Sequence, residues 1–314
     1  MAEAGVAAGS EGAAVTGPGA AATGGPAGRA PGPPSAAVPG PDPRSGPRER
    51  LSEVWWVAWR QLRKLTRNPF LLFWSLMMPL IWLILFSQTF SKVFERGASL
   101  PGATPLPYDF VAVMLPGIAV MTAIQSSAQS GFGMVMDMDS GFMDKLFVAP
   151  IHRSSVLLGK LLADGLRMAG QAAIVLFIAW AFTHAFGWRI PFAAGPGGTA
   201  LIVLLAAGFG MAFSGLSNTV ALRSRNTETT MLVSFTLTFP LLFLSSAMLP
   251  EALLPTWVQD FSRVNPVSYL ADASRPLILT GWNITAIGHA VAAIAIMGIL
   301  LNGLAMLSFR RLGR

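Results

Sequence analysis

The sequence predicts an all-α integral membrane protein with six transmembrane helices and an amphipathic helix before the first of them. Three observations predict this fold. Of the 314 residues, 53% are hydrophobic and only 12% are charged, whereas soluble domains carry about 25% charged residues. Apolar segments near the ~20 residues needed to cross the hydrocarbon core recur along the chain. Basic residues gather at the ends of these segments on one side of the membrane.

Residues 1–50 differ from the rest of the chain, being nearly all Ala, Gly and Pro without an apolar run. Such a segment cannot bury enough surface to offset the entropy of ordering it, so we expect a disordered tail. It also lacks the continuous apolar core of a signal peptide. A single transmembrane domain is expected over 51–314.

An amphipathic helix is expected at the start of this domain. Apolar residues recur along it at helical spacing, at Leu51, Trp55, Ala58, Leu62 and Leu65. Its cations are Arg60, Arg63, Lys64 and Arg67. Basic amphipathic helices with tryptophans lie in the membrane interface near anionic headgroups, which is the interpretation favoured here. The alternative is a cytosolic helix that packs on the chain's own loops.

The six predicted spans lie near 70–90, 110–133, 162–187, 199–222, 230–249 and 285–309. Prolines fall inside the first, second and fifth spans, at Pro79, Pro116 and Pro240. Membrane helices tolerate an internal proline when neighbouring groups satisfy the freed carbonyl. These prolines therefore predict kinks rather than breaks.

The charge distribution predicts that both termini are cytoplasmic. Lys and Arg are abundant before the first span, after the second, after the fourth and after the last, and they are sparse on the other side. Cytoplasmic segments of membrane proteins carry this excess of basic residues. The same rule accounts for the net charge of +7 without a nucleic-acid partner. We expect a multi-pass protein of the cell membrane.

Several kinds of chemistry are excluded or disfavoured. The chain has no cysteine, so it forms no disulfide and has no thiolate nucleophile. Its one Gly-Lys pair, Gly159-Lys160, lacks the rest of the P-loop pattern, and three dispersed histidines indicate no metal site. Asp137, Asp139 and Asp144 do not have the spacing of a calcium loop and are expected to be solvated loop acids. No catalytic residue is expected.

Polar residues in the inner half of the second span need partners. They are Gln125, Ser126, Ser127, Gln129 and Ser130. In lipid their donors and acceptors would be stranded, so they should face protein or a water-filled path. Helix–helix bonding and a substrate pathway explain them equally well. The candidate pathway residues are Gln125, Ser126 and Gln129, with Phe235 and Phe239 of the fifth span.

An ionisable pair lies near the cytoplasmic end of the third span. Asp164 and Arg167 are three residues apart and can pair on one helical face. A structural ion pair is favoured over a transport relay, although ionisable residues inside spans are often functional.

The cytoplasmic segment after the second span contains, in order, Asp139, Gly141, Asp144-Lys145, Pro150 and Arg153-Ser154. Farther along, the segment from Pro240 to Pro250 is followed by Trp257 and by Asn265-Pro266-Val-Ser-Tyr269. These motifs resemble those of the type-2 ABC exporter permeases, especially the daunorubicin-resistance (DrrB-like) branch. The resemblance covers most of 51–314. The sequence departs from the family at Phe142, where many relatives carry Thr or Ile.

The resemblance implies a coupling helix at about 140–149 that docks into a groove of a separate ATPase subunit. Its coupling residues would be Asp139, Gly141, Phe142, Asp144, Lys145, Leu146, Pro150 and Arg153. Phe142 and Leu146 would form an apolar anchor within a polar rim. The alternative is a solvated loop helix. The resemblance also implies two permease copies, as a homodimer, and two ATPase subunits. ATP and Mg²⁺ would bind to the ATPase, and this chain would hold no cofactor.

Prolines and charges along 250–281 exclude one long helix and deep exposure to lipid. We therefore expect short re-entrant helices in the outer leaflet, shielded by protein. The resemblance implies that they gate the exit. The outer-gate residues would be Pro250, Trp257, Asn265, Pro266 and Tyr269. A lid that does not gate is the alternative.

The resemblance implies export of hydrophobic drugs, antibiotics or lipids by alternating access, driven by ATP hydrolysis on the partner. An alternative within transport is export of a glycolipid or polysaccharide chain. A third possibility is a membrane anchor that recruits an ATPase without transporting anything. The sequence does not name the substrate, and the outward direction comes from the resemblance.

Overall fold

The computed structural model describes residues 46–67, 69–98, 107–148, 152–251 and 254–311, all within one unit of the chain, Val38–Arg314. The predicted disordered tail, 1–50, lies outside the described residues as far as 45. Its last residues belong to a helix that begins at Pro47, so the tail was predicted too long. Within them the chain forms α-helices, α1 to α10, and no strand. The predicted all-α class is therefore confirmed.

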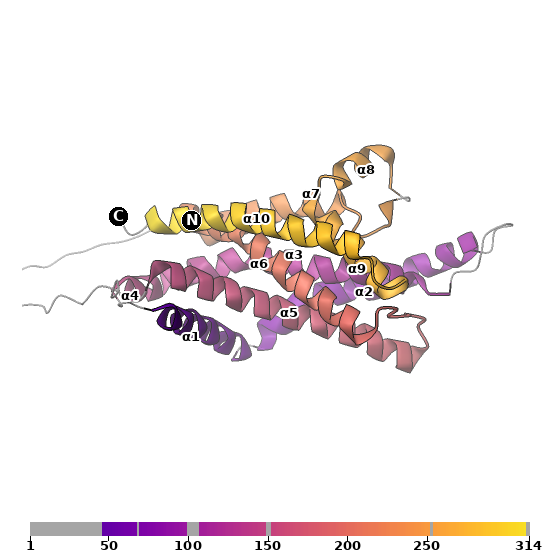
Figure 1. Ribbon diagram of the computed structural model, residues 1–314, viewed down its shortest axis with the longest axis horizontal. Helices are drawn as coiled ribbons and strands as arrows, with labels where there is room; N and C mark the ends of the chain where they lie inside the picture. The colour runs from indigo at the N-terminus through magenta and orange to yellow at the C-terminus, as the bar shows by residue number, and fades with distance from the viewer. Residues whose placement is uncertain (1–45, 68, 99–106, 149–151, 252–253, 312–314) are drawn as a thin grey trace, which may run out of the picture. The chain divides into compact units, whose positions relative to one another are not determined.

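The long helices lie alongside one another (Figure 1). They are α2 (Pro69–Ala98), α3 (Phe110–Asp139), α5 (Arg153–Phe186), α6 (Gly195–Ser224) and α10 (Ile284–Arg311), with the shorter α7 (Thr227–Phe243) beside them. Short helices lie toward the two ends. These are α1 (Pro47–Thr66) and α4 (Phe142–Val148) at one end, and α8 (Thr256–Ser262) and α9 (Pro266–Leu279) toward the other.

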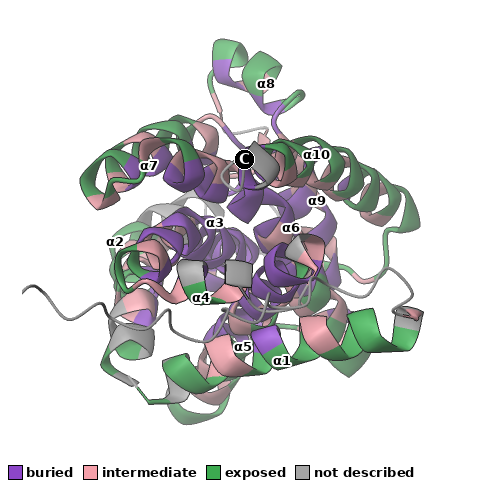
Figure 2. Cartoon of the chain, turned by 90° about the vertical axis from the view of Figure 1, so that its left-hand side faces the viewer, coloured by how far each residue is buried: buried purple, intermediate pink, exposed green. Residues whose placement is uncertain are grey.

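Helix α3 lies in the middle of the bundle. It packs against α2, α5, α6, α7 and α9, which surround it in Figure 2. Every residue from Phe110 to Ile124 is buried. Farther along, one stripe at helical spacing is less covered: Gln125, Gln129, Phe132 and Gly133 are half-buried, and Met136 is exposed. The centre of the fold is thus a helix with a single partly open face.

Four of the described helices are long and apolar enough to cross a membrane: Phe110–Asp139, Ser154–Ala185, Gly195–Ser224 and Ile284–Phe309. They correspond to the second, third, fourth and sixth predicted spans. Helices α2, with 30 residues, and α7, with 17, occupy the places of the first and fifth. The count of six therefore stays a prediction. Pro79, Pro116 and Pro240 lie inside α-helices, so none of them ends a helix.

The fifth predicted span extended too far. Helix α7 ends at Phe243 rather than near 249. Beyond it, the N–H of Ser246 donates to Ser268 Oγ at 3.2 Å, and the N–H of Ala247 donates to Ser245 Oγ at 3.2 Å. Serine hydroxyls thus take the place of helical carbonyls, and the backbone leaves the helix without stranding its donors.

Helix α3 meets this non-helical segment at Gly117. A Cβ added to Gly117 would overlap the backbone carbonyl of Ala247. Because the obstacle is backbone, a rotamer change would not relieve the overlap. Only glycine allows α3 to approach the segment this closely.

Candidate functional site

Helix α4 follows α3 after a turn at Gly141. The φ angle of Gly141 is +64°, a left-handed conformation that glycine adopts without strain. The helix occupies Phe142–Val148, inside the predicted 140–149. Asp139 and Lys145 are exposed, and Gly141 is half-buried. The side chains of Asp144 and Arg153, and all of Pro150, lie outside the described part of the structure.

The two predicted apolar contacts of α4 are partly used within the chain. Cζ of Arg60 lies 3.3 Å from the centroid of the Phe142 ring, a cation–π contact between α1 and α4. Leu146 packs against a buried cluster that includes Met134 and Leu157. Both side chains are half-buried. A docking partner would therefore contact only the exposed parts of the Phe142 and Leu146 side chains, together with exposed Lys145 and Asp139.

Asp137 was expected to be a solvated loop acid, and this expectation is wrong. It is 4% exposed and lies in the last turn of α3. Its carboxylate accepts hydrogen bonds from Gln61 Nε2 at 2.8 Å and Lys64 Nζ at 3.2 Å, and Arg60 Nη2 lies 3.7 Å away. All three partners belong to α1, far away in sequence. Local spacing therefore contained no sign of these contacts.

The same contacts set the electrostatics of this end of the molecule. Burial lowers the pKa of Arg60 below its ordinary value, and the neighbouring carboxylate of Asp137 opposes that shift. The guanidinium thus lies between a carboxylate and the ring of Phe142. These side chains join α1, α3 and α4 into one unit.

Helix α1 packs on α5 at a close approach. A Cβ added to Gly159 would lie 2.7 Å from the carbonyl oxygen of Val54. The predicted apolar face of α1 is split, because Ala58 is buried while Leu51 and Trp55 are exposed. The exposed tryptophans are Trp55, Trp56 and Trp59. The helix therefore packs on the protein along one side and presents apolar rings on another. Its place in the membrane interface stays a prediction.

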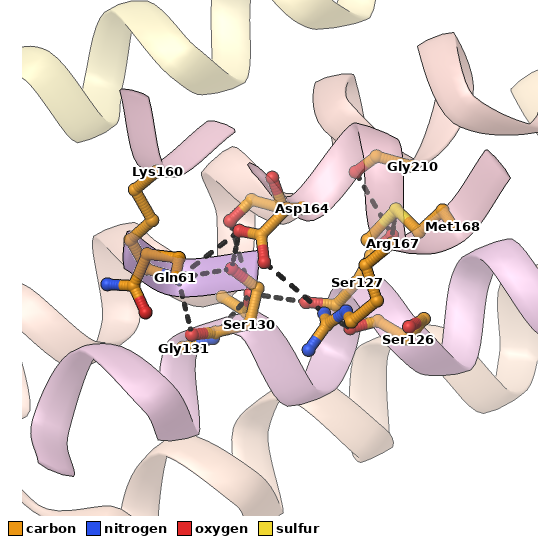
Figure 3. A network of polar contacts seen from close by, with 12 residues as sticks. Gln61, Ser126, Ser127, Ser130, Gly131, Lys160, Asp164, Arg167, Met168 and Gly210 are labelled. Atoms are coloured by element: carbon orange, nitrogen blue, oxygen red, sulfur yellow. Dashed lines mark hydrogen bonds and ion pairs between the residues drawn. The ribbon is translucent and has the colours of Figure 1, made fainter. Parts of the chain in front are cut away.

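A network of polar side chains joins α3 to α5 (Figure 3). Asp164 lies 3.2 Å from Lys160 Nζ and 3.3 Å from Arg167 Nη2. The predicted Asp164–Arg167 pair is confirmed, and Lys160 is an additional member. Ser130 donates to Asp164 and accepts from Lys160 at 3.0 Å. The side chains are only 9% exposed for Lys160, 8% for Asp164 and 14% for Arg167. One buried carboxylate therefore balances two cations.

The serines of α3 bond to other helices. Ser126 donates to Gln171 Oε1 at 2.6 Å, and Ser127 Oγ lies 3.1 Å from the carbonyl oxygen of Gly210. For these two, helix–helix bonding is the observed role. Gln125 and Gln129 lie on the partly open stripe and have no hydrogen-bond partner within the described residues. The predicted pathway set is thus divided, with Ser126 on a different side of α3 from the two glutamines.

The aromatic members of that set lie on the next helix. Helix α7 packs beside α3, and Phe235 and Phe239 are 43% and 62% exposed. Another side of α7 is buried and carries Thr230, Ser234 and Thr238. The structure therefore places the two glutamines and the two phenylalanines on neighbouring helices and leaves all four at least partly uncovered.

Among the predicted outer-gate residues, Asn265 has the clearest role. Its Oδ1 accepts from the N–H of Val267 at 3.0 Å and so caps the start of α9. Its Nδ2 donates to the carbonyls of Leu241 and Leu244, at 2.7 and 2.9 Å. One amide group thus begins α9 and satisfies carbonyls at the end of α7.

The other outer-gate residues surround this cap or stand on α8. Pro266 is the first residue of α9, and the hydroxyl of Tyr269 donates to the carbonyl of Arg263. Trp257 is exposed on α8, and Pro250 is half-buried in the segment after α7. The sequence interpretation missed three residues that hold this region together, namely Ser246, Asp272 and Arg275. The spacing of Asp272 and Arg275 was an available signal, because residues three apart pair on a helix.

Replacing Asn265 by Asp is expected to destabilise the outer segment. Aspartate keeps the oxygen that caps α9 but has no donor for the carbonyls of Leu241 and Leu244, and it buries a charge. Leaving a buried group unsatisfied costs about 1–3 kcal/mol, so the melting temperature of the purified chain should fall. Asn226→Asp is the matched control, because exposed Asn226 caps α7 through Oδ1 alone. Equal melting temperatures for the two variants would contradict the assignment.

The fold and the geometry of its two ends define a multi-pass helical membrane protein. Residues 52–279 match the family model described as "ABC-2 type transporter". Among the relatives is the putative transport permease ycf38 of Cyanophora paradoxa, 29% identical over 231 residues, which are 72% of this chain and 73% of that one. Another is the daunorubicin resistance ABC transporter permease protein DrrB1 of Streptomyces coeruleorubidus, 27% identical over 226 residues, 70% of this chain and 72% of the relative. The probable multidrug ABC transporter permease YbhR of Escherichia coli K12 is 23% identical over 195 residues, 62% of this chain and half of the relative.

The chain therefore belongs to the ABC-2 type transporter family. It is a transmembrane permease subunit of an ABC transporter, and the resemblance to the daunorubicin-resistance branch is confirmed.

Proposed function

We propose that this permease exports hydrophobic small molecules, such as drugs, antibiotics or lipids, by alternating access powered by a separate ATPase. Relatives named for daunorubicin resistance and multidrug transport support the substrate class. The structural observation that carries the proposal is the position of α3. At one end its Asp137 bonds to α1, whose Arg60 contacts Phe142 of α4; at the other end its Gly117 meets the segment after α7. Between them lies the partly open stripe with Gln125 and Gln129.

The proposal includes a topology. Helices α2 and α7 complete six spans in the cell membrane, with both termini in the cytoplasm and one domain that begins with α1. Helix α1 lies in the cytoplasmic interface, its tryptophans among lipid headgroups. Helices α8 and α9 form a re-entrant segment in the outer leaflet. The distribution of basic residues and the separation of α1 and α4 from α8 and α9 support this orientation.

The ATPase docks on α4 and would bind ATP and Mg²⁺ itself, while this chain performs no bond chemistry. The exposed charges Asp139 and Lys145 orient the partner, and the uncovered parts of Phe142 and Leu146 add apolar contact. Motion of α4 would pass to α1 through the contact of Phe142 with Arg60, and from α1 to α3 through the hydrogen bonds and ion pairs of Asp137. These contacts would make the three helices move together.

A second copy of the chain would complete the substrate path. The side-chain amides of Gln125 and Gln129 lie within a long apolar helix, and transferring an unpaired amide into an apolar environment costs about 1–3 kcal/mol by mutational estimates. A homodimer that covers the partly open stripe of α3 would remove these amides from lipid. The enclosed path would be lined by amides and by the rings of Phe235 and Phe239, without a charged side chain among them.

The test is ATPase activity of the reconstituted permease–ATPase complex in lipid, with and without hydrophobic drugs. Intact complex should be stimulated by drugs. Asp137→Asn should still bind the ATPase but lose most of the stimulation, because α1 no longer has an anion to hold its cations. Asp139→Asn combined with Lys145→Gln should instead weaken ATPase binding, since these two side chains are exposed and have no described side-chain partner.

The two variants separate docking from transmission. If both behave like the intact chain, the assignment of α4 as the docking helix is wrong. If no drug changes the ATPase rate while a polysaccharide or glycolipid does, the chain exports a polymer. An ATPase that binds but responds to no compound would favour the non-transporting anchor.

A further inference from the structure

Several hydrogen bonds of Ser246 tie the segment after α7, 244–250, to α9. The Ser246 carbonyl accepts a hydrogen bond from Arg275 Nη2, and its hydroxyl donates to Asp272 Oδ1 at 2.7 Å. Its N–H donates to Ser268 Oγ at 3.2 Å. All three partners belong to α9. The next residue, Ala247, lies against α3 at Gly117. The hydrogen bonds between α9 and Ser246 therefore fix the position of this segment against α3.

Two of the three partners form an ion pair at the surface of a cavity. Arg275 Nη1 lies 3.4 Å from Asp272 Oδ1, and the side chains are 12% and 44% exposed. Arg275 Nε is buried without a hydrogen-bond partner among the described residues. Both residues line a cavity of about 300 Å³ with Pro276, Leu279 and Thr280. The cavity opens at the surface of the chain, where 44% of the Asp272 side chain is exposed.

The pair is poorly compensated for its burial. Desolvation is the largest cause that raises the pKa of Asp272 above its ordinary value of 3.8, assisted by nearby Glu251 and opposed by Ser246 and Arg275. Desolvation likewise lowers the pKa of Arg275, against the attraction of Asp272. For each group the desolvation thus outweighs the attraction of its partner in setting the direction of the pKa shift, although the Asp272 side chain remains 44% exposed.

Few other charges face this pair. Helices α3 and α6, which pack on α9, carry no charged residue along 110–136 and 195–222. Helix α10 contributes His289, whose ring lies edge-on to Tyr269. Glu251 comes from the segment after α7. The proton equilibrium of this site is therefore governed by Asp272, Arg275 and Glu251.

We propose that Asp272 and Arg275 form a latch on the outer gate, and that a proton from the outside stabilises the closed position of segment 244–250. The description of this segment as a gate rests on the proposed export function. A carboxyl whose pKa is raised in the closed state binds its proton more tightly there than in an open, hydrated state. The stabilisation of the closed state is thus complete in acid and is lost as the pH rises through the raised pKa. At neutral pH the charged pair favours opening.

The absence of cysteine makes a direct test possible. In proteoliposomes, a Met248→Cys chain reports opening through its rate of labelling by a membrane-impermeant maleimide. The same rate is measured in a chain that also carries Asp272→Asn and Arg275→Gln. These amides keep an acceptor for the Ser246 hydroxyl and a donor for its carbonyl, but carry no charge. The ratio of the two rates cancels the pH dependence of the thiol itself.

We expect the charged pair to label faster than the neutral one at neutral pH, and the ratio of the two rates to fall as the pH is lowered through the raised pKa of Asp272. Asp260→Asn, which removes an exposed acid on α8, should leave the ratio unchanged. A ratio independent of pH would overturn the proposal. So would faster labelling of the neutral pair at neutral pH, which would mean that the charges hold the segment closed.

A second measurement guards against misfolding. The neutral pair should melt at the same temperature as the charged pair or higher, because desolvation is the largest effect on both charged groups and the amides remove that cost. A lower melting temperature would contradict the poor compensation on which the latch depends. Neither assay uses ATP or substrate, so the latch can fail while drug-stimulated ATPase activity stands, and the reverse.

Discussion

Replacement of Asp164 by Asn will lower the melting temperature of the purified chain more than neutralising any exposed acid. The substitution leaves Lys160 and Arg167 as two buried cations without a counter-charge. Removing one partner of a buried ion pair costs about 3–5 kcal/mol, and here one carboxylate serves two partners. Tryptophan fluorescence during heating of the detergent-solubilised chain measures the shift.

Asp139→Asn is the control for this experiment. Asp139 is exposed at the end of α3, and its substitution removes one carboxylate charge, as Asp164→Asn does. Adding Lys160→Gln to Asp164→Asn should recover part of the loss, since it removes one of the two uncompensated cations. A melting temperature for Asp164→Asn equal to that of the control would mean that the buried carboxylate contributes nothing to stability.

Gly117→Ala is expected to destabilise the chain although alanine is the better helix former. Within a helix the exchange of Gly for Ala normally stabilises by about 1 kcal/mol. At Gly117 the added methyl would overlap the carbonyl of Ala247, and either α3 or the segment after α7 must move. The melting temperature should fall, and Met248→Cys should label faster in this background.

Gly133→Ala supplies a matched control on the same helix. A Cβ at Gly133 meets no atom within 4 Å, so this variant should show only the gain from helix propensity. If Gly117→Ala lowers the melting temperature and Gly133→Ala raises it, the crossing at Gly117 is a close packing contact. Stabilisation of both would show that the crossing tolerates a methyl group.

The elements that the sequence predicted well are those set by local patterns. Apolar length predicted the helices that became α3, α5, α6 and α10, and proline spacing predicted the short α8 and α9. The fifth span was placed too long because its apolar run continues beyond Phe243. What ends α7 there is a set of hydroxyl and amide partners from α9, and hydropathy carries no information about them.

The site was harder to predict because its contacts are long-range. The spacing of Asp164 and Arg167 on one helix was sufficient to pair them, whereas Asp137 needed α1 to supply its partners. Phe142 was assigned wholly to a docking partner, since nothing in the local sequence places Arg60 over its ring. The serines of α3 were correctly expected to face protein, whereas the environment of its two glutamines stays a prediction. Only the three-dimensional packing separates bonded Ser126 from half-buried Gln125.

The double cap made by Asn265 has a practical consequence for work on this protein. The side-chain amide of Asn265 ties the end of α7 to the start of α9. The chain between these two helices, including α8, is therefore a loop whose two ends are held together. Chain length within such a loop can change at small entropic cost, since each doubling of a loop adds only about 0.6 kcal/mol. The turn before α8, near Pro255, is therefore a suitable insertion point for an epitope tag or a fluorescent reporter. A tag at that position would show which side of the membrane this end of the molecule faces while leaving the helix bundle intact.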